Sequence, residues 1–547
     1  MEAKATKKNN RNGLLLLTVL CILTAVLYLI VRTVLFILLD FAWYEKLVAL
    51  LLLLAELFIL THGIGYFLEI YRVLTRSPAP QRQESRPPFQ GPYPPVAVIV
   101  SSYHEPLEVV EETLITFYNL TYPNKHIYFL DDTRYDLPGK DPQEMAAYRR
   151  AVDEMCERIG VNLFRRKWHG AKAGMINDFL AFIGGEFREG FEFRNFSGKE
   201  STGPITYIVV FDADQNPLPG FVEPLVQRME EEPGLAFVQT PQYYTNFGEN
   251  RIARASGLQQ AVFYEYICEG KSLSDAMFCC GTNVIFRREA LVDVGGFDET
   301  SVTEDFATSL KFHLKGWNSS YSGRVMAFGM GPEDLGGYFK QQFRWALGTV
   351  GLLRTVIGYF AGHPLRLASV KWWEYFLSST HYFVGLVFLI MVTCPLLYLF
   401  LRVPSYFARP EIYILFFIPY FVLTLSIFFW TLKKRQYAVR DLILGQLLLA
   451  VTFPVYIRAS ILALLGVRGT FGITPKGGSV SLPLHALWPQ LLLATLNFSA
   501  IVWGANRIFF EREPLWAIVV NMFWCSYHFA ILSSVLYFNA PERPESA

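Results

Sequence analysis

The chain has 547 residues, of which 52% are hydrophobic and only 18% are charged. A soluble protein carries roughly 25% charged residues, so the composition excludes a disordered chain and indicates a membrane protein with a large water-exposed part. With 49 basic and 48 acidic residues the formal charge is +1, which indicates no nucleic-acid partner. The seven cysteines form no C-x-x-C pair, so neither a zinc site nor a disulfide framework is expected.

Six apolar runs have about the length that a helix needs to cross a bilayer. They are residues 14–31, 47–68, 376–401, 412–432, 484–504 and 515–538. The first is expected to be an anchor, because it lacks a small-residue cleavage pattern and a second run follows soon after. Glu56 interrupts the second run, either as a functional group or as a carboxylate paired with a neighbour.

A seventh apolar run, residues 442–457, has only 16 residues, contains Pro454 and is bounded by Arg440 and Arg458. It is too short to cross and predicts a helix at the membrane surface. Lys and Arg cluster before the first span, after the second and after the fourth, and basic residues favour the cytoplasmic side. We therefore expect six spans in the plasma or inner membrane, with both termini and the globular domain in the cytoplasm.

The predicted organisation has five parts and contains no internal repeat. They are a transmembrane pair (1–76), a linker rich in Pro, Gln and Arg (77–95), a globular cytoplasmic domain (96–334), interfacial helices (335–372), and a C-terminal transmembrane region (373–547) with an interfacial helix (441–466) and a loop (468–480). The composition of the middle part is that of one globular domain.

Strands alternate with helices in the globular domain. Buried strands are predicted at 96–102, 127–130, 207–211 and 235–238, and helices at 107–120 and 146–159. This order predicts an α/β fold with a largely parallel sheet covered on both faces. Ligands bind beyond the carboxyl ends of strands in such sheets, and two acidic clusters, Asp131-Asp132 and Asp212-Ala213-Asp214, fall there.

The pair Asp212 and Asp214 offers hard oxygen ligands, which suit magnesium or manganese. A D-x-D sequence alone is usually a solvated turn, but this one follows an apolar strand in step with Asp131-Asp132. Thr303 is a candidate N-cap for a helix at 306–315, and Glu304 and Asp305 would then stabilise the helix start through its dipole.

A Q-x-x-R-W pattern lies in the predicted helix 338–348. Its three side chains are Gln341, Arg344 and Trp345, which a helix places on one face. The patch suits a phosphate and a sugar ring, although an ordinary interfacial helix would also carry an Arg and a Trp at its boundary.

The order D, D-x-D, E-D and Q-x-x-R-W resembles the processive branch of glycosyltransferase family 2, which includes cellulose, curdlan, chitin and hyaluronan synthases. The resemblance extends from about Pro95 to the last membrane helix. It implies a GT-A-like nucleotide-sugar-binding domain inserted between transmembrane helices, and an inverting hexosyltransferase that is similar to cellulose and curdlan synthases. The implied partners are a UDP-sugar donor, foremost UDP-glucose, a growing polysaccharide, the lipid bilayer, and export or periplasmic accessory proteins.

The resemblance also implies the residues of the donor site. Tyr103 and Glu105 match the segment that begins the nucleotide pocket. Asp131 and Asp132 would hold the uridine, and Lys172 in His-Gly-Ala-Lys-Ala-Gly would face the diphosphate.

The same resemblance implies a metal site and a base. Asp212 and Asp214 would hold the donor and Mg²⁺ (or Mn²⁺), and Asp305 would be the general base. Two positions depart from the family pattern: Met175 stands where Asn is usual, and Gln242 stands where cellulose synthases usually have a His near the metal. Gln242 would offer the ion a carbonyl in place of an imidazole.

The acceptor side is implied in the same way. Gln341 and Arg344 would bind the diphosphate, and Trp345 would stack on the acceptor sugar. The pair Cys280-Gly281 matches a Phe-Cys-Gly segment that lines the acceptor site.

One loop points to the cellulose synthase branch. Phe471, Thr474 and Lys476 match an F-x-V-T-x-K gating loop, although the segment is also an ordinary Gly- and Pro-rich connector. The chain ends soon after residue 538, so no C-terminal cyclic-di-GMP-binding domain is expected. The alternatives are a chitin- or hyaluronan-like amino-sugar polymer synthase, a non-processive lipid-linked sugar transferase, and a membrane transport or scaffold protein with a degenerate transferase domain.

Overall fold

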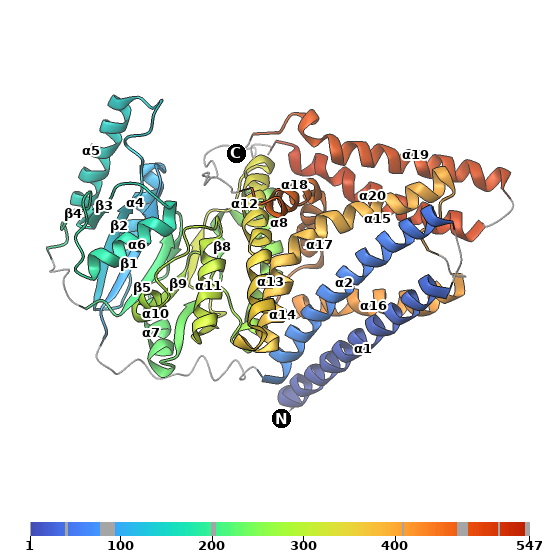
Figure 1. Ribbon diagram of the computed structural model, residues 1–547, viewed down its shortest axis with the longest axis horizontal. Coiled ribbons are helices and arrows are strands. Elements are labelled where there is room, and N and C mark those ends of the chain that lie inside the picture. Colours follow the sequence, from blue (N-terminus) through green and yellow to red (C-terminus); the bar gives the residue numbers. More distant parts are fainter. Residues whose placement is uncertain are drawn as a thin grey trace.

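A computed structural model describes residues 2–38, 42–76, 93–198, 204–406, 410–467, 480–511 and 515–541. The described residues form an α/β domain and, beside it, a bundle of long helices (Figure 1). The bundle combines the two helices at the N-terminus with those of the C-terminal third. The middle of the chain therefore forms the α/β domain, and helices from before and after this domain lie together in the bundle.

Within the described residues, six helical segments are long and apolar enough to cross a membrane. They are Arg11–Leu38, Trp43–Arg76, Ser369–Leu401, Ile414–Lys433, Leu484–Phe510 and Leu515–Asn539. The corresponding helices are α1 (Glu2–Leu38), α2 (Trp43–Arg76), α14 (Ser369–Thr380) with α15 (Val384–Leu401), α16 (Pro410–Lys434), α19 (Trp488–Phe510) and α20 (Leu515–Asn539). Each segment overlaps one of the six predicted apolar runs, so the prediction of about six membrane-length helices is confirmed.

The seventh apolar run forms two helices, where the sequence predicted one. They are α17 (Val439–Val451) and α18 (Phe453–Leu464), bent by 48°. Pro454 lies in the first turn of α18, where its missing N–H and fixed φ favour a new helix start over a continuous helix. Taken as one bent unit, the pair would count as a seventh span by length and composition.

Both short helices pack against helices that extend from the α/β domain. Leu448 and Val451 of α17 share a core with Ile252 of α8 (Arg251–Val262). Tyr456 of α18 packs with residues of α12 (Leu335–Gly351). The pair therefore lies where the α/β domain meets the bundle.

The charge inside the second predicted span is paired. Glu56 accepts hydrogen bonds from Arg32 Nε and from the Tyr28 hydroxyl, both at 2.7 Å. Arg32 also stacks over the Tyr406 ring, with its Cζ 4.4 Å from the ring centroid. Of the two interpretations of Glu56, the structure supports the carboxylate paired with a neighbour.

The α/β domain is built on an eight-stranded sheet with the strand order β10-β7-β9-β5-β1-β2-β3-β4. Its strands are β1 (Val96–Ser102), β2 (Lys125–Asp131), β3 (Asn162–Arg165), β4 (Glu192–Arg194), β5 (Tyr207–Asp212), β7 (Leu235–Gln239), β9 (Val284–Arg287) and β10 (Asn318–Tyr321). A second, three-stranded sheet holds β6 (Asn216–Pro217), β11 (Ala327–Gly329) and β8 (Tyr243–Tyr244). All four predicted strands are present.

The large sheet is mixed, whereas the sequence predicted a largely parallel one. The four-residue strand β9 lies antiparallel between β5 and β7, and β4 lies antiparallel to β3. Strands of three or four residues carry too little periodicity to be recognised in a single sequence.

Helices cover both faces of the large sheet (Figure 1). They are α4 (Leu107–Tyr118), α5 (Pro142–Ile159), α6 (Ala171–Ile183), α7 (Val222–Glu231), α10 (Arg288–Asp293) and α11 (Glu304–Lys315). Strand β1 alternates between two cores, with Val98 on the side of α4, α5 and α7 and Ile99 on the side of α6 and α11. Burial on both faces explains why its sequence is continuously apolar.

The remaining helices connect the domain to the bundle. They are α8, a π-helical turn (Phe263–Cys268), α9 (Glu269–Ser272), α12 and α13 (Leu353–Gly362). Figure 1 shows α8 and α12 between the sheet and the long helices. The catalytic candidates on α11 and α12 are thereby placed close to the bundle.

Candidate active site

Strand register brings the two predicted acidic clusters to one edge of the sheet. Asp131 is paired with Ser102 at the end of β1, and Asp212 is paired with Ser101 on the other side of β1. The two aspartates therefore flank the carboxyl end of the same strand, where ligands bind in open α/β sheets.

Asp131 is buried beside basic side chains. Its Oδ2 accepts hydrogen bonds from Arg165 Nε and from the Tyr135 hydroxyl, both at 2.6 Å. Arg166 lies 2.9 Å from Asp132 Oδ1. Burial raises the pKa of Asp132 to about 7, although Arg166 acts in the opposite direction. The two carboxylates are thus held in place by their neighbours.

A hollow of about 270 Å³ opens next to Asp131. It is lined by Asp131, Thr133, Tyr135, Arg149, Arg165, Arg166, Lys167, Gly190 and Glu192. The segment with Tyr103 and Glu105 lies beside it, because the backbone N–H of His104 donates to Thr133 Oγ1 at 3.1 Å and the Tyr148 hydroxyl donates to the Glu105 carbonyl at 2.7 Å. This hollow is large enough for one ring of a small ligand.

Sequence reasoning missed the basic residues of this hollow. Arg165 ends β3, which was not predicted, and Arg166 follows it; Arg165 pairs with Asp131 and Arg166 with Asp132. Two consecutive arginines after an apolar pair were the available signal, but their partners are more than 30 residues away in the sequence.

Lys172 connects the acidic edge of the sheet to the segment predicted to line the acceptor site. Its Nζ donates hydrogen bonds to Asp212 Oδ1 and, at 2.9 Å, to the Gly281 carbonyl. Burial lowers the pKa of Lys172, but the carboxylates of Asp212, Glu304 and Asp305 outweigh burial, so the pKa is raised. Lys172 is therefore an ammonium surrounded by acids.

Asp305 lies in the first turn of α11 and points at Gly281. A Cβ on Gly281 would be 2.9 Å from Asp305 Oδ2, and Gly281 has φ +84°, so both the contact and the backbone favour glycine. Burial and, next, the Glu304 carboxylate raise the pKa of Asp305 to about 7. A carboxylate with a pKa near the working pH is suited to accept a proton.

Thr303 does not cap α11 through its side chain, contrary to the expectation. It occupies the N-cap position without a capping hydrogen bond. Its side chain instead lies against α12, where a Cβ on Gly348 would be 2.5 Å from Thr303 Cγ2. The start of α11 and the middle of α12 are thus in direct contact.

Helix α12 carries the Q-x-x-R-W residues. Arg344 lies close enough to Asp305 and Glu304 to lower the pKa of each, against the dominant effect of burial. Gln341 Oε1 is buried and has no hydrogen-bond partner within the described part of the chain. Trp345 is partly buried on the same helix.

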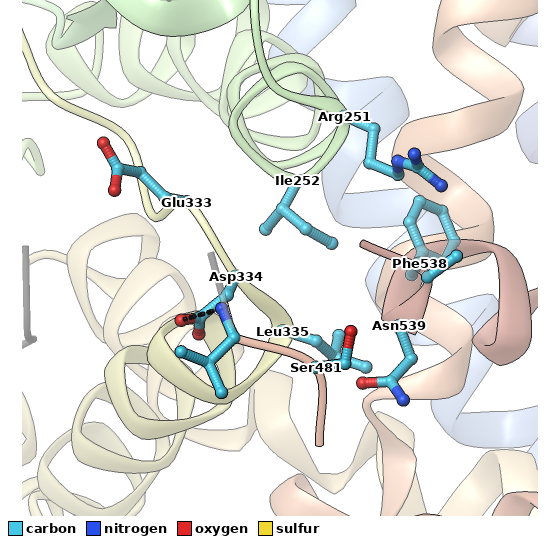
Figure 2. Close-up of a pocket in the computed structure, with 10 residues that line it drawn as sticks. Arg251, Ile252, Glu333, Asp334, Leu335, Ser481, Phe538 and Asn539 are labelled. Atoms are coloured by element: carbon cyan, nitrogen blue, oxygen red, sulfur yellow. Dashed lines mark hydrogen bonds between the residues drawn. The ribbon is translucent and has the colours of Figure 1, made fainter. Parts of the chain in front are cut away.

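The start of α12 is tied to the C-terminal part of the chain. Asp334 Oδ1 accepts the backbone N–H of Gly337 at 2.6 Å and so caps the helix, while Oδ2 accepts the N–H of Val480 at 3.4 Å (Figure 2). Asn539 exchanges two hydrogen bonds of 2.8 Å with the backbone of Leu482. The cavity among these residues is about 10 Å³, room for about one water, so it is no sugar site.

Each of the three predicted metal ligands lies next to other groups of the protein. Asp212 N donates to Thr282 Oγ1 at 2.8 Å, and Gln242 Nε2 donates to the Cys280 carbonyl at 3.2 Å. Asp214 lies near Tyr244, whose pKa is raised by burial and, less strongly, by this carboxylate. The described residues contain no group of three or more His, Cys, Asp or Glu side chains that could hold a metal ion.

Two carboxylates nevertheless fit a cation that arrives with a diphosphate. Magnesium usually keeps several waters and is bound through one or two carboxylates together with substrate phosphates. Asp212 and Asp214 offer that donor set, and the Asp212 side chain is 46% exposed. The loop residues Phe471, Thr474 and Lys476 lie outside the described residues.

The chain was compared with known families and proteins. A model described as glycosyl transferase family 2 matches residues 97–295, and one described as glycosyl transferase family group 2 matches residues 207–432. The chain is 27% identical over 461 residues to the cellulose synthase catalytic subunit (UDP-forming) of Pseudomonas fluorescens (strain SBW25), covering 81% of this chain and 56% of that protein. It is also 27% identical over 509 residues to putative cellulose synthase 2 of Komagataeibacter xylinus, covering 88% of this chain and 30% of that protein.

The chain therefore spans less than two thirds of the length of these relatives. Among solved structures, the mannosyltransferase PcManGT from Pyrobaculum calidifontis, in complex with GDP-Man and Mn²⁺, aligns with a TM-score of 0.45 and 15% identity over 76% of this chain. That likeness is too weak to carry an argument about donor or metal.

Fold, membrane helices and relatives together define a multi-pass membrane glycosyltransferase. The chain contains a glycosyltransferase family 2 domain and is similar over most of its length to cellulose synthases.

Proposed function

We propose that the chain is a processive β-glycan synthase, which transfers glucose from UDP-glucose to the end of a growing polysaccharide and moves the polymer across the membrane. The observation that carries this proposal is the convergence on Gly281. Lys172 donates to its carbonyl, and Asp305 packs against its α-carbon. A cation for the donor diphosphate and a carboxylate for the acceptor hydroxyl thus approach one residue from two sides.

The donor site uses the edge of the sheet. The uracil occupies the hollow beside Asp131, with Tyr103, Glu105 and Asp132 around it, and the diphosphate lies toward Lys172. Gln341 and Arg344 bind the diphosphate from α12, with the side-chain amide N–H group of Gln341 and the guanidinium of Arg344 as hydrogen-bond donors. Binding by a guanidinium and an ammonium compensates the charge of the donor.

Asp305 is the base of the proposed reaction. It takes the proton of the acceptor hydroxyl while the hydroxyl oxygen forms a bond to the anomeric carbon and the bond from that carbon to the diphosphate oxygen breaks. A single in-line displacement of this kind turns an α-linked donor into a β-linked product. Base catalysis typically contributes about 10²–10⁴-fold to such a rate.

Asp212 and Asp214 would hold Mg²⁺ or Mn²⁺, with Gln242 nearby. When bound, the ion neutralises charge that develops on the departing diphosphate. Lys172 contributes to the same stabilisation from the protein, because its ammonium already lies between Asp212 and the Gly281 carbonyl.

The acceptor enters from the bundle side. Trp345 stacks on the terminal sugar, Cys280 and Gly281 line its path, and the polymer leaves between the membrane helices. We place α17 and α18 at the membrane surface, because both pack on helices of the α/β side. With the α/β domain in the cytoplasm of a plasma or inner membrane, UDP-sugar would be used inside and polymer delivered outside.

The test is product analysis with membranes that contain the full chain. Incubation with each common UDP-sugar should yield a β-linked glucan from UDP-glucose alone. Many glucose units should be added to each chain end that is extended. Accumulation of a single-sugar product, or of an N-acetylglucosamine polymer, would contradict the proposal. The relatives that support glucose are cellulose synthases, one of them described as UDP-forming.

A further inference from the structure

A hydrogen-bonded group outside the assigned site joins the loop before Lys172 to the loop that leads into α11. Glu299 lies in the second loop. Its Oε2 is 3.1 Å from His169 Nδ1, and its Oε1 accepts a hydrogen bond of 2.8 Å from Asn177. Asn177 also donates to the Phe297 carbonyl at 3.0 Å and accepts the Phe297 N–H at 2.7 Å. These contacts hold the loop that leads into α11 against His169 and against Asn177 of α6.

The other side of His169 reaches the nucleotide hollow. His169 Nε2 is 2.7 Å from Oδ2 of Asp178, which is 3% exposed. Arg166 lies 3.6 Å from the same oxygen, pairs with Asp132, and donates to the Ala171 carbonyl at 3.0 Å. A continuous set of contacts therefore runs from the uridine side, past the residue next to Lys172, to the loop before α11.

The carboxylate of Glu299 approaches Gly170 so closely that the position has no room for a Cβ unless Glu299 moves. A Cβ on Gly170 would lie 2.3 Å from Glu299 Oε2, and Gly170 has φ +57°. A side chain there would push Glu299 away, because real Cβ atoms do not approach other atoms this closely. Lys172 follows two residues later, and Asp305 six residues after Glu299, so the contact lies between the two halves of the reaction centre.

We propose that Glu299 and His169 are positioning residues that set the distance between Lys172 and the base Asp305. The inference rests on the proposed function. Neither residue is among the donor contacts assigned above, and Lys172 has its own contacts to Asp212 and Gly281. Loss of the brace (Glu299, His169, Asn177 and Asp178) therefore misaligns the reacting groups while donor binding survives.

The first test is Glu299→Ala in the full-length membrane protein, with UDP release and polymer measured at varied UDP-glucose. Misplacement of reacting groups by about 1 Å can cost about 100-fold, so a loosened brace should lower kcat by about 10-fold or more. The donor KM should stay within about twofold, because no donor contact is lost. Glu299→Gln keeps an acceptor for Asn177 and should recover part of kcat. Glu144→Ala, an exposed acid at the start of α5, is the matched control and should change neither parameter.

The second test uses the close approach itself. Gly170→Ala should lower kcat, whereas Gly198→Ala, with a similar φ of +65° and nothing within 4 Å of a Cβ, should not. In the double variant Gly170→Ala/Glu299→Ala the new Cβ no longer meets the Glu299 carboxylate. The fold decrease in kcat of the double variant should therefore be smaller than the product of the fold decreases of the two single variants. An unchanged kcat in Glu299→Ala, multiplicative losses in the double variant, or an equal loss in Gly198→Ala would overturn the brace. An inactive unmodified protein would overturn the proposed function and this inference together.

Discussion

Replacement of Asp305 by Asn tests the centre of the proposed mechanism with the smallest change in shape. Asn can keep the contact with Gly281 and the hydrogen bond of 2.7 Å from the Phe306 N–H, but it cannot take up a proton. Polymer synthesis should fall by at least about 100-fold, which corresponds to about 2.7 kcal/mol of transition-state stabilisation. UDP affinity should be retained, because the assigned donor contacts lie on Asp131, Lys172 and α12.

The pH dependence of kcat/KM in the unmodified protein is a second test of Asp305 as the base. Burial raises the pKa of Asp305 to about 7, and the base works only as the carboxylate. A group with this pKa is about 10% ionised at pH 6 and about 90% at pH 8, so kcat/KM should rise about 10-fold over that interval. The residual activity of Asp305→Asn should lack this rise.

The raised pKa also sets the sign of the effect on stability. A carboxyl whose pKa is higher in the folded state than in the unfolded state favours folding at acid pH, and this contribution is lost as the pH rises through about 7. Asp305→Asn removes the buried charge, so its melting temperature at pH 8 should equal or exceed that of the unmodified protein. A rate loss without unfolding separates catalysis from folding.

The assay is UDP release together with polymer weight, measured in membranes with normalised protein content. Glu304→Gln is the informative companion, because it removes the neighbouring charge that raises the pKa of Asp305 and should move the rise in activity to lower pH. Asp293→Asn, an acid on the surface of the same domain, should leave the rate unchanged. Near-normal synthesis by Asp305→Asn would refute the assignment of the base.

Three further predictions follow from the site and the topology. Gly281→Ala should lower synthesis by about 10-fold or more, because its Cβ would be 2.9 Å from Asp305 Oδ2 and misplace the base; a full rate would contradict that close contact. Asp214→Asn should weaken the dependence of donor turnover on Mg²⁺ or Mn²⁺, since a hard cation loses an anionic ligand. Synthesis by the unmodified protein that continues in the presence of a chelator would contradict the metal assignment. A cysteine at the exposed Val467, just after α18, should react with an impermeant thiol reagent from the cytoplasmic side only, and labelling from outside would make α17 and α18 a true span.

The sequence was sufficient for the features that depend on local pattern. Membrane-length apolar runs, the buried strand at 96–102 and the helix that carries Gln341, Arg344 and Trp345 all appear where periodicity and run length placed them. These features are local because a bilayer or a two-sided core imposes the same demand on every residue of an element. The helix break at Pro454 is local too, and the sequence analysis used that proline only as evidence against a span.

Short strands and long-range pairs depended on the tertiary structure. The strand Val284–Arg287 has four residues, and its antiparallel place between β5 and β7 follows from the path of the chain around it. Arg165 and Arg166 became the partners of Asp131 and Asp132 only when β3 was laid beside β2. The sequence of β3 does not indicate these ion pairs, because the aspartates that pair with Arg165 and Arg166 lie in another part of the chain.

In the reaction centre, the sequence indicated which residues take part, and the tertiary structure was needed for their positions. Its acidic and basic residues were recognisable from the order of their motifs, since each motif is a few residues long. Their mutual distances were not, because Lys172, Gly281 and Asp305 come from a helix start, a loop and a second helix start that are far apart in the chain. The packing of α6 and α11 on the sheet that contains β9 brings them together, and burial there, rather than residue type, raises the pKa of Asp305.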